Sequence, residues 1–131
     1  MGRGLEAYGA LVLRIFLGVI YMAHAYLALF VMGPAKAIEY QRAIHIPLPE
    51  IGAWYLILAH GLGGLLLILG IMVRWAALAN IPIIAGALWF VHLPQGFFIF
   101  GGKNGYEYVL FLLGATIAQA LLGAGAFTFR K

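Results

Sequence analysis

Four ionisable side chains lie in parts of this sequence where apolar residues dominate. His92 and Glu107 are on either side of the glycine-rich stretch "GGKNG". Imidazole and carboxylate groups exchange protons in the accessible pH range, so this pair is a candidate proton path. His24 and His60 lie deeper in apolar runs, and they are candidates for contacting a quinone or, as a lesser alternative, for ligating a haem b. Structural hydrogen bonding between helices is the ordinary role of such histidines.

An aromatic side chain accompanies one of these histidines. Trp89 and His92 share a helical face with Ala85, at the spacing i, i+4 and i+7. A flat ligand such as a quinone could stack on this indole ring. Anchoring at the membrane interface is the alternative role, because tryptophan is enriched there.

A second polar group consists of Arg14, Asn80 and Gln119. Counting residues from the helix ends places all three at a similar depth, roughly 9 to 12 Å from one surface. We expect a structural polar layer in which Arg14 donates hydrogen bonds to Asn80 or Gln119. The same count places Glu107 near the opposite surface, too far away to pair with Arg14.

The composition is that of a membrane protein. Apolar residues make up 65% of the 131 residues, and the mean hydropathy is +1.02. Such a chain has too little polar surface to cover a soluble globule. The 8 Lys and Arg residues are spread singly along the chain, whereas a nucleic-acid site needs a clustered basic face.

The sequence contains no cysteine. It therefore cannot form a disulfide, exchange thiols or hold an iron–sulfur cluster by itself. We expect no metal site either. A redox role would depend on a bound cofactor.

Four apolar stretches are long enough to cross a hydrocarbon layer of ~30 Å. The sequence predicts an all-α fold, an integral membrane four-helix bundle with short loops and antiparallel neighbours, as a single domain over residues 1–131. The polar segment 33–50 is either a short interfacial helix or a hydrated loop. The expected spans are 8–32, 50–72, 74–93 and 106–127.

The basic residues indicate an orientation. With four spans both termini lie on one side of the membrane, and the slight excess of Lys and Arg on that side favours cytoplasmic termini. We expect a multi-pass protein of a prokaryotic inner membrane. The basic residues on the terminal side are Arg3, Arg74, Arg130 and Lys131, and those opposite are Lys36, Arg42 and Lys103.

Several segments resemble the DoxX family of small four-span membrane proteins. They are "LRIFLGVIYMAHA", "IPLPEIGAW", "GGLLLILGIMVRWAAL", "HLPQGFF" and "GYEYVLFLLG". Two positions depart from the family pattern, because His60 replaces an expected glutamate and Ala28 an expected lysine. The resemblance implies a setting in membrane redox systems, which in this family include a thiosulfate:quinone oxidoreductase subunit and complexes with sulfur-transfer or superoxide-handling proteins.

Two functions follow as hypotheses. In the first, the chain is a subunit of a quinone-linked oxidoreductase in electron transport and contributes a quinone or proton site. In the second, it is a structural or assembly subunit without chemistry of its own, and its polar groups only fix the helix register. A bundle that binds haem b ranks third. The expected partners are membrane lipid and either other subunits of a redox complex or further copies of the chain.

Overall fold

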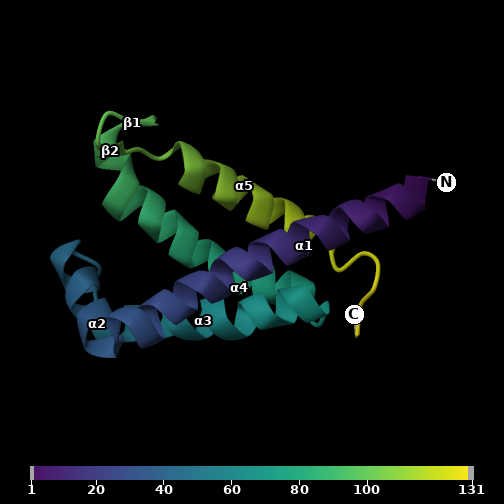
Figure 1. The fold of residues 1–131 in the computed structure, drawn as a ribbon, viewed down its shortest axis with the longest axis horizontal. Coiled ribbons are helices and arrows are strands. Elements are labelled where there is room, and N and C mark those ends of the chain that lie inside the picture. Colours follow the sequence, from purple (N-terminus) through teal and green to yellow (C-terminus); the bar gives the residue numbers. More distant parts are fainter. Residues whose placement is uncertain (1, 130–131) are drawn as a thin grey trace.

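The computed structural model describes residues 2–129, and its side chains from residue 4 onward (Figure 1). The expected all-α bundle is confirmed. Its helices are α1 (Gly2–Tyr26), α2 (Pro34–Ala43), α3 (Pro49–Leu69), α4 (Val73–Ala87) and α5 (Glu107–Leu122). Shorter elements are the π-helical segments η1 (Leu27–Met32) and η2 (Leu88–His92), the 3-10 turn η3 (Leu93–Gln95), and the strands β1 (Ile99–Phe100) and β2 (Lys103–Asn104).

The long helices form two pairs. α1 packs along α3, α4 packs along α5, and α3 contacts α4. Contacts between α1 and α5 are fewer, and their hydrogen bonds join Gln119 to Ala10 and Tyr21 to Thr116. Figure 1 shows the pairs diverging toward α2 on one side and the β1–β2 hairpin on the other. The bundle is therefore tight at the end that carries both termini and wider at the opposite end.

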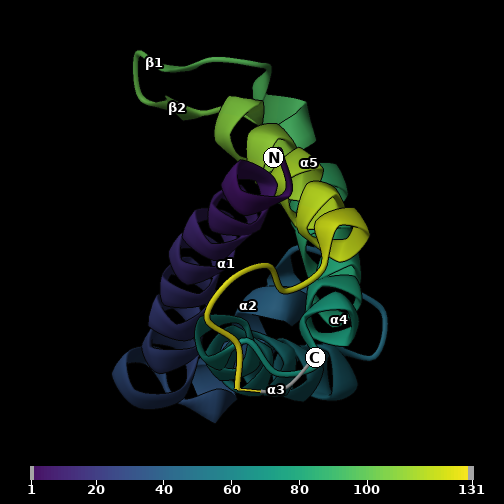
Figure 2. The ribbon, with the colours of Figure 1, turned by 90° about the vertical axis from the view of Figure 1, so that its right-hand side faces the viewer.

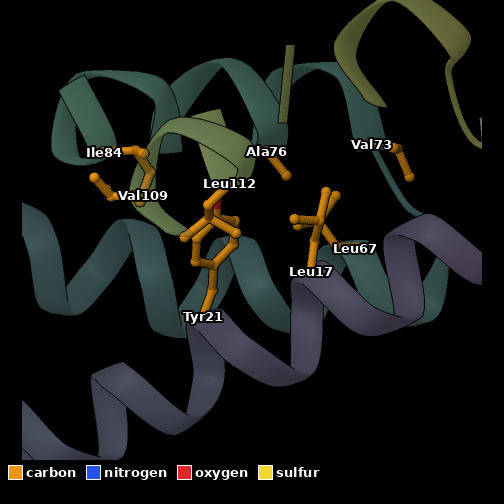
Figure 3. Close-up of a cluster of buried hydrophobic side chains, with 8 residues drawn as sticks. All are labelled: Leu17, Tyr21, Leu67, Val73, Ala76, Ile84, Val109 and Leu112. Atoms are coloured by element: carbon orange, nitrogen blue, oxygen red, sulfur yellow. The ribbon is translucent and has the colours of Figure 1, made fainter. Parts of the chain in front are cut away.

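Glycines bring α1 and α3 into close contact. A Cβ on Gly18 would lie 2.7 Å from the Gly64 carbonyl oxygen, and a Cβ on Gly64 would lie 2.9 Å from the Gly18 carbonyl oxygen. Only residues without a side chain allow this approach. The apolar core lies beside it and is drawn in Figure 3: Leu17, Tyr21, Leu67, Val73, Ala76, Ile84, Val109 and Leu112.

The chain is a multi-pass integral membrane protein that contacts lipid. Among the described residues, three helical stretches are long and apolar enough to cross a membrane: Gly4–Met32, Pro49–Leu69 and Val73–Gln95. α5 is apolar but has only 16 residues. It ends at Leu122 rather than near Phe127, because Gly123 adopts a positive φ of 82° and turns the chain back.

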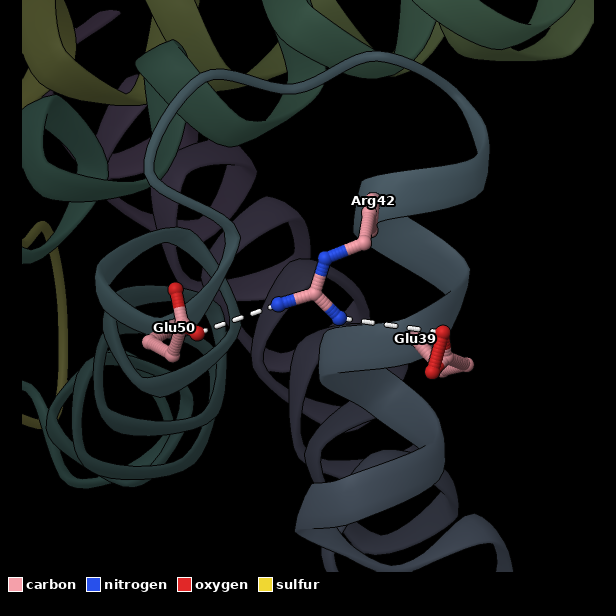
Figure 4. A network of polar contacts seen from close by, with 3 residues as sticks. All are labelled: Glu39, Arg42 and Glu50. Carbon is pink, nitrogen blue, oxygen red and sulfur yellow. Dashed lines mark hydrogen bonds and ion pairs between the residues drawn. The ribbon is translucent and has the colours of Figure 1, made fainter.

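The polar segment after α1 contains the helix α2. Proline at its first position suits a helix start, and Ala37 buries against the bundle. Arg42 joins this helix to α3 through Glu50 at 3.1 Å and contacts Glu39 at 3.7 Å (Figure 4). These exposed pairs contribute at most about 1 kcal/mol. The helix thus lies over the wide end of the bundle mainly by apolar packing.

We expect the chain to cross the membrane four times, with α5 as the fourth span. Reporter fusions that signal the cytoplasmic or the opposite side should then disagree between residue 131 and the turn at Gly101–Gly105. A fusion in α2 should agree with the one in the turn. If the reporters at residue 131 and in the turn agreed, α5 would lie on the membrane surface instead of crossing it.

Candidate functional site

Arg14 is fully buried in the narrow end of the bundle. All five of its N–H groups donate hydrogen bonds to backbone carbonyl oxygens. They belong to Leu67 at 3.0 Å, Ile68 at 2.8 Å, Ala124 at 2.8 Å, Ala126 at 2.6 Å and Phe127 at 2.5 Å. The expected bonds from Arg14 to Asn80 or Gln119 are therefore wrong, because the guanidinium has no donor left for them.

The partners of Arg14 are carbonyl groups that lack helical partners. The last four carbonyl oxygens of a helix accept no hydrogen bond from an N–H group of the same helix. At the end of α3, Leu66 accepts from Gly70 and Ile71, and Leu69 accepts from Phe129. Arg14 donates to the two carbonyls between them, those of Leu67 and Ile68. The cation also interacts favourably with the negative end of the α3 dipole.

The other half of this network is the segment Gly123–Phe129, which we call the C-terminal strap. Figure 2 looks onto this end and shows the strap running from α5 to the end of α3. The Ala126 N–H donates to Ala7 of α1 at 3.0 Å. Gly125 is required in the strap, because a Cβ there would lie 2.4 Å from the Ala7 oxygen. Arg14 thereby ties α1, α3 and the strap together.

Asn80 and Gln119 have separate partners. Gln119 donates to the carbonyls of Ala10 at 3.3 Å and Gly123 at 2.9 Å, and its Oε1 is buried without a hydrogen bond. Asn80 donates to backbone carbonyls of α3 and α4, and its Oδ1 contacts His60. Of the three polar residues predicted as one layer, Asn80 therefore belongs to a separate network. Asn80 supports a histidine, whereas Arg14 and Gln119 fix the narrow end.

A cavity of about 590 Å³ occupies the wide end of the bundle, between α1, α2, α3, α4 and α5. Its walls are mostly apolar, and they include residues of both π-helical segments. Such segments are frequent at functional sites. The polar side chains in the walls are Tyr21, His24, Tyr40, Gln41, Tyr55, His60, His92, Asn104 and Tyr108.

Three of the histidines selected from the sequence lie in this cavity. His24, His60 and His92 come from α1, α3 and η2 and all line its walls. The rings of His24 and His60 are 6.3 Å apart between centroids. Tyr21 stacks on His60 at 4.7 Å with an interplanar angle of 10°. Its hydroxyl forms a hydrogen bond with Thr116, which holds the stack in place.

Each remaining site candidate has a different position. The Nδ1 atom of His92 lies 2.8 Å from the carbonyl oxygen of Asn104. Glu107 Oε2 accepts a hydrogen bond from the backbone N–H of Ile99 at 2.8 Å, and the residue is not part of the cavity wall. Trp89 is 66% exposed and is also outside the wall. Glu107 and Trp89 therefore lie outside the wall of the cavity that the histidines line.

The sequence did not single out Tyr21, Gln41 or Asn104. Tyr21 precedes His24 by three positions, a spacing that places both on one helical face, and this was the available signal. Gln41 reaches the cavity only because α2 folds over it, where a Cβ on Gly52 would meet its Oε1 at 2.2 Å. Asn104 lines the cavity because it lies in β2 of the β1–β2 hairpin. No local sequence pattern predicts that Gln41 or Asn104 lines the cavity.

A haem between His24 and His60 does not fit this arrangement. The macrocycle would have to separate α1 from α3 beside the two imidazoles. These helices touch there, because a Cβ on Gly61 would lie 3.4 Å from the Cβ of Ala25. Within the part of the chain that the structure describes, no group of three or more His, Cys, Asp or Glu residues could hold a metal ion.

Comparison with known proteins gave one result. A model of the DoxX family matches residues 9–93. A search of curated proteins and a search of solved structures gave no significant match. The matched range includes the three cavity histidines and ends before Glu107.

Proposed function

The chain belongs to the DoxX family, and from this premise we propose that it is the membrane subunit of a quinone-linked redox complex. In this proposal the ring of the quinone binds in the cavity at the wide end of the bundle. The observation that supports it is the cavity itself. Apolar walls with a few convergent polar groups are typical of small-molecule sites.

The size and chemistry of the cavity agree with a quinone. Its volume of about 590 Å³ is within the range of about 300–1,000 Å³ seen for ligand pockets. Apolar residues can enclose the ring and the start of an isoprenoid tail. Histidines can hydrogen-bond the two ring oxygens and exchange protons with them.

The exposure of His24 also favours a ligand. His24 lies inside the α1 span, yet its side chain is exposed in the isolated chain. Ionisable groups within membrane helices almost always face a bundle interior or a water-filled cavity. Because α1 and α5 diverge toward the wide end of the bundle (Figure 1), a lipid-dissolved molecule can enter the cavity between them.

The proposed setting follows from the family and the topology. We propose a prokaryotic inner membrane, with cytoplasmic termini and with partner subunits that supply or remove electrons. A structural subunit without a ligand is the second candidate. The observation that favours it is the Arg14 network, which organises the narrow end without contributing to the cavity.

A substitution that fills the cavity should remove the quinone. Gly86 lines the cavity in α4, and a Cβ on it meets nothing within 4 Å. We expect Gly86→Leu to fold and to lower the quinone that copurifies in mild detergent by about fivefold or more. The measurement is chromatography of an organic extract after complete oxidation, so that both redox forms are counted.

The matched control is Gly114→Leu. Gly114 is exposed on α5, outside the cavity wall, and a Cβ there also meets nothing within 4 Å. This variant should retain the quinone of the wild-type protein. An equal quinone content in both variants, or none in the wild-type protein, would favour the structural subunit.

A further inference from the structure

We infer that the cavity selects the reduced, dihydroxy form of its ring ligand, because His60 and His92 each offer it a hydrogen-bond acceptor. This inference rests on the proposed function and adds the redox form that binds and the atoms that recognise it. Its basis is the tautomer of each imidazole, which the surrounding amide and carbonyl groups determine.

The tautomer of His60 is fixed through Asn80. The Nδ2 group of Asn80 donates to the carbonyls of Ala59 at 3.0 Å and Ala76 at 2.9 Å. These two acceptors identify the nitrogen end of the amide. The oxygen Oδ1 therefore faces His60 Nδ1, at 2.5 Å. Because Oδ1 only accepts, Nδ1 must carry the hydrogen.

The other ring nitrogen of His60 is then an acceptor. A neutral imidazole with its hydrogen on Nδ1 has a lone pair on Nε2. His60 is only 4% exposed, and no Asp or Glu among the described residues lines the cavity to balance a positive charge. Within residues 4–129, no side-chain or backbone donor bonds to its Nε2. A ligand in the cavity can therefore donate a hydrogen bond to this atom.

His92 repeats this arrangement with a different partner. Its Nδ1 lies 2.8 Å from the carbonyl oxygen of Asn104. A carbonyl oxygen only accepts, so Nδ1 donates and a neutral His92 also presents a lone pair on Nε2. Asn104 belongs to β2, so the β1–β2 hairpin supplies the carbonyl that fixes the tautomer of His92. Two histidines that line one cavity from different elements therefore each keep an unprotonated Nε2.

The two redox forms of the ligand differ in whether their ring oxygens can donate a hydrogen bond. The two oxygens of a quinone ring are carbonyls and only accept, so they cannot bond to an unprotonated Nε2. The oxygens of the reduced ring are hydroxyls and can donate to both histidines. His24 has no hydrogen bond among the described residues that fixes its tautomer, so it adapts to either form. In this inference His60 contacts a hydroxyl group of the reduced ligand and not a carbonyl of the quinone.

Three probes with the same ring skeleton test this inference. They are 2-methyl-1,4-dihydroxynaphthalene, its dimethyl ether and 2-methyl-1,4-naphthoquinone, each titrated anaerobically into the purified protein in mild detergent. The dimethyl ether keeps the ring and both oxygens but has no hydroxyl to donate. We expect the dihydroxy probe to bind about tenfold more tightly than the other two, as two hydrogen bonds of ordinary strength would give.

Substitutions of His60 and His92 test whether these residues cause the preference for the dihydroxy probe. His60→Phe keeps a ring that can stack on Tyr21, and His92→Phe affects a less buried site. Each should reduce the preference for the dihydroxy probe over the dimethyl ether by about threefold or more. The control is His45→Asn, since His45 lies in the loop before α3, outside the cavity wall, and asparagine tolerates its positive φ of 69°. This control should keep the full preference.

The outcomes distinguish the inference from the proposed function. Equal binding of the dihydroxy probe and its dimethyl ether by the wild-type protein would overturn the inference and leave the quinone site intact. Tighter binding of the quinone than of the dihydroxy probe would overturn it as well. Failure of all three probes to bind would reject the proposed function together with the inference. If His60→Phe does not fold, the wild-type comparison and His92→Phe decide.

Discussion

Arg14→Met should lower the free energy of unfolding by about 3–5 kcal/mol, because it leaves several buried carbonyl groups without a hydrogen-bond donor. Methionine fills a similar volume but donates no hydrogen bond. It would leave the carbonyls of Leu67, Ile68 and the C-terminal strap without partners in a buried place. Each unpaired group carries a desolvation penalty of about 1–3 kcal/mol, and relaxation of the strap would recover part of the sum. The measurement is unfolding in detergent micelles, followed by circular dichroism.

The controls separate geometry from charge. Arg14→Lys keeps the charge, but its three donors lie on one nitrogen and cannot reach carbonyls on both sides of a planar fork. We expect it to lose about half as much stability as Arg14→Met. Arg74→Met should change stability by less than about 1 kcal/mol, because Arg74 is exposed and its bond to Leu121 is 3.4 Å long. A wild-type melting curve for Arg14→Met would show that the strap is not held by Arg14.

This network explains what the sequence could and could not predict about the fold. Apolar length and the glycine-rich break at Gly101–Gly105 indicated where the long helices lie. Depth counting correctly excluded Glu107 as a partner of Arg14. The actual partners are backbone carbonyls, which every residue has, so no residue type marks them. They become available only because α3 ends and the strap folds back at the same depth.

For the site, burial chemistry was a better guide than helical spacing. His24, His60 and His92 were selected as ionisable groups within apolar runs, and the structure places all three in one cavity. Trp89 was selected by α-helical spacing from His92. Both residues belong to the π-helical segment η2, which takes more residues per turn, so positions three apart no longer share a face. The same change of pitch leaves Trp89 facing outward.

His92→Gln should lower quinone-linked turnover by about a hundredfold, the lower part of the range for loss of a group that transfers protons. Glu107→Gln should stay within about twofold of the wild-type rate. The difference follows from position. His92 lines the cavity and offers Nε2 to a ligand, whereas Glu107 lies outside the wall and accepts from the N–H of Ile99. A glutamine at 107 keeps an oxygen for that bond, so the hairpin that carries Asn104 is retained.

The assay uses the redox complex proposed above, purified in mild detergent and compared at matched quinone content. Glutamine at position 92 can still donate to the Asn104 carbonyl, so lost turnover would reflect the missing proton acceptor and not a displaced hairpin. Glu107→Ala provides the converse test, because it removes the acceptor for Ile99 and should loosen the hairpin, which limited proteolysis between β1 and β2 would detect. If Glu107→Gln lost turnover with its hairpin still protected from protease, Glu107 would belong to the proton path together with His92. If both glutamine variants kept the wild-type rate, protons would have to reach the cavity through another group, and His24, the histidine exposed within its span, would be the one to replace next.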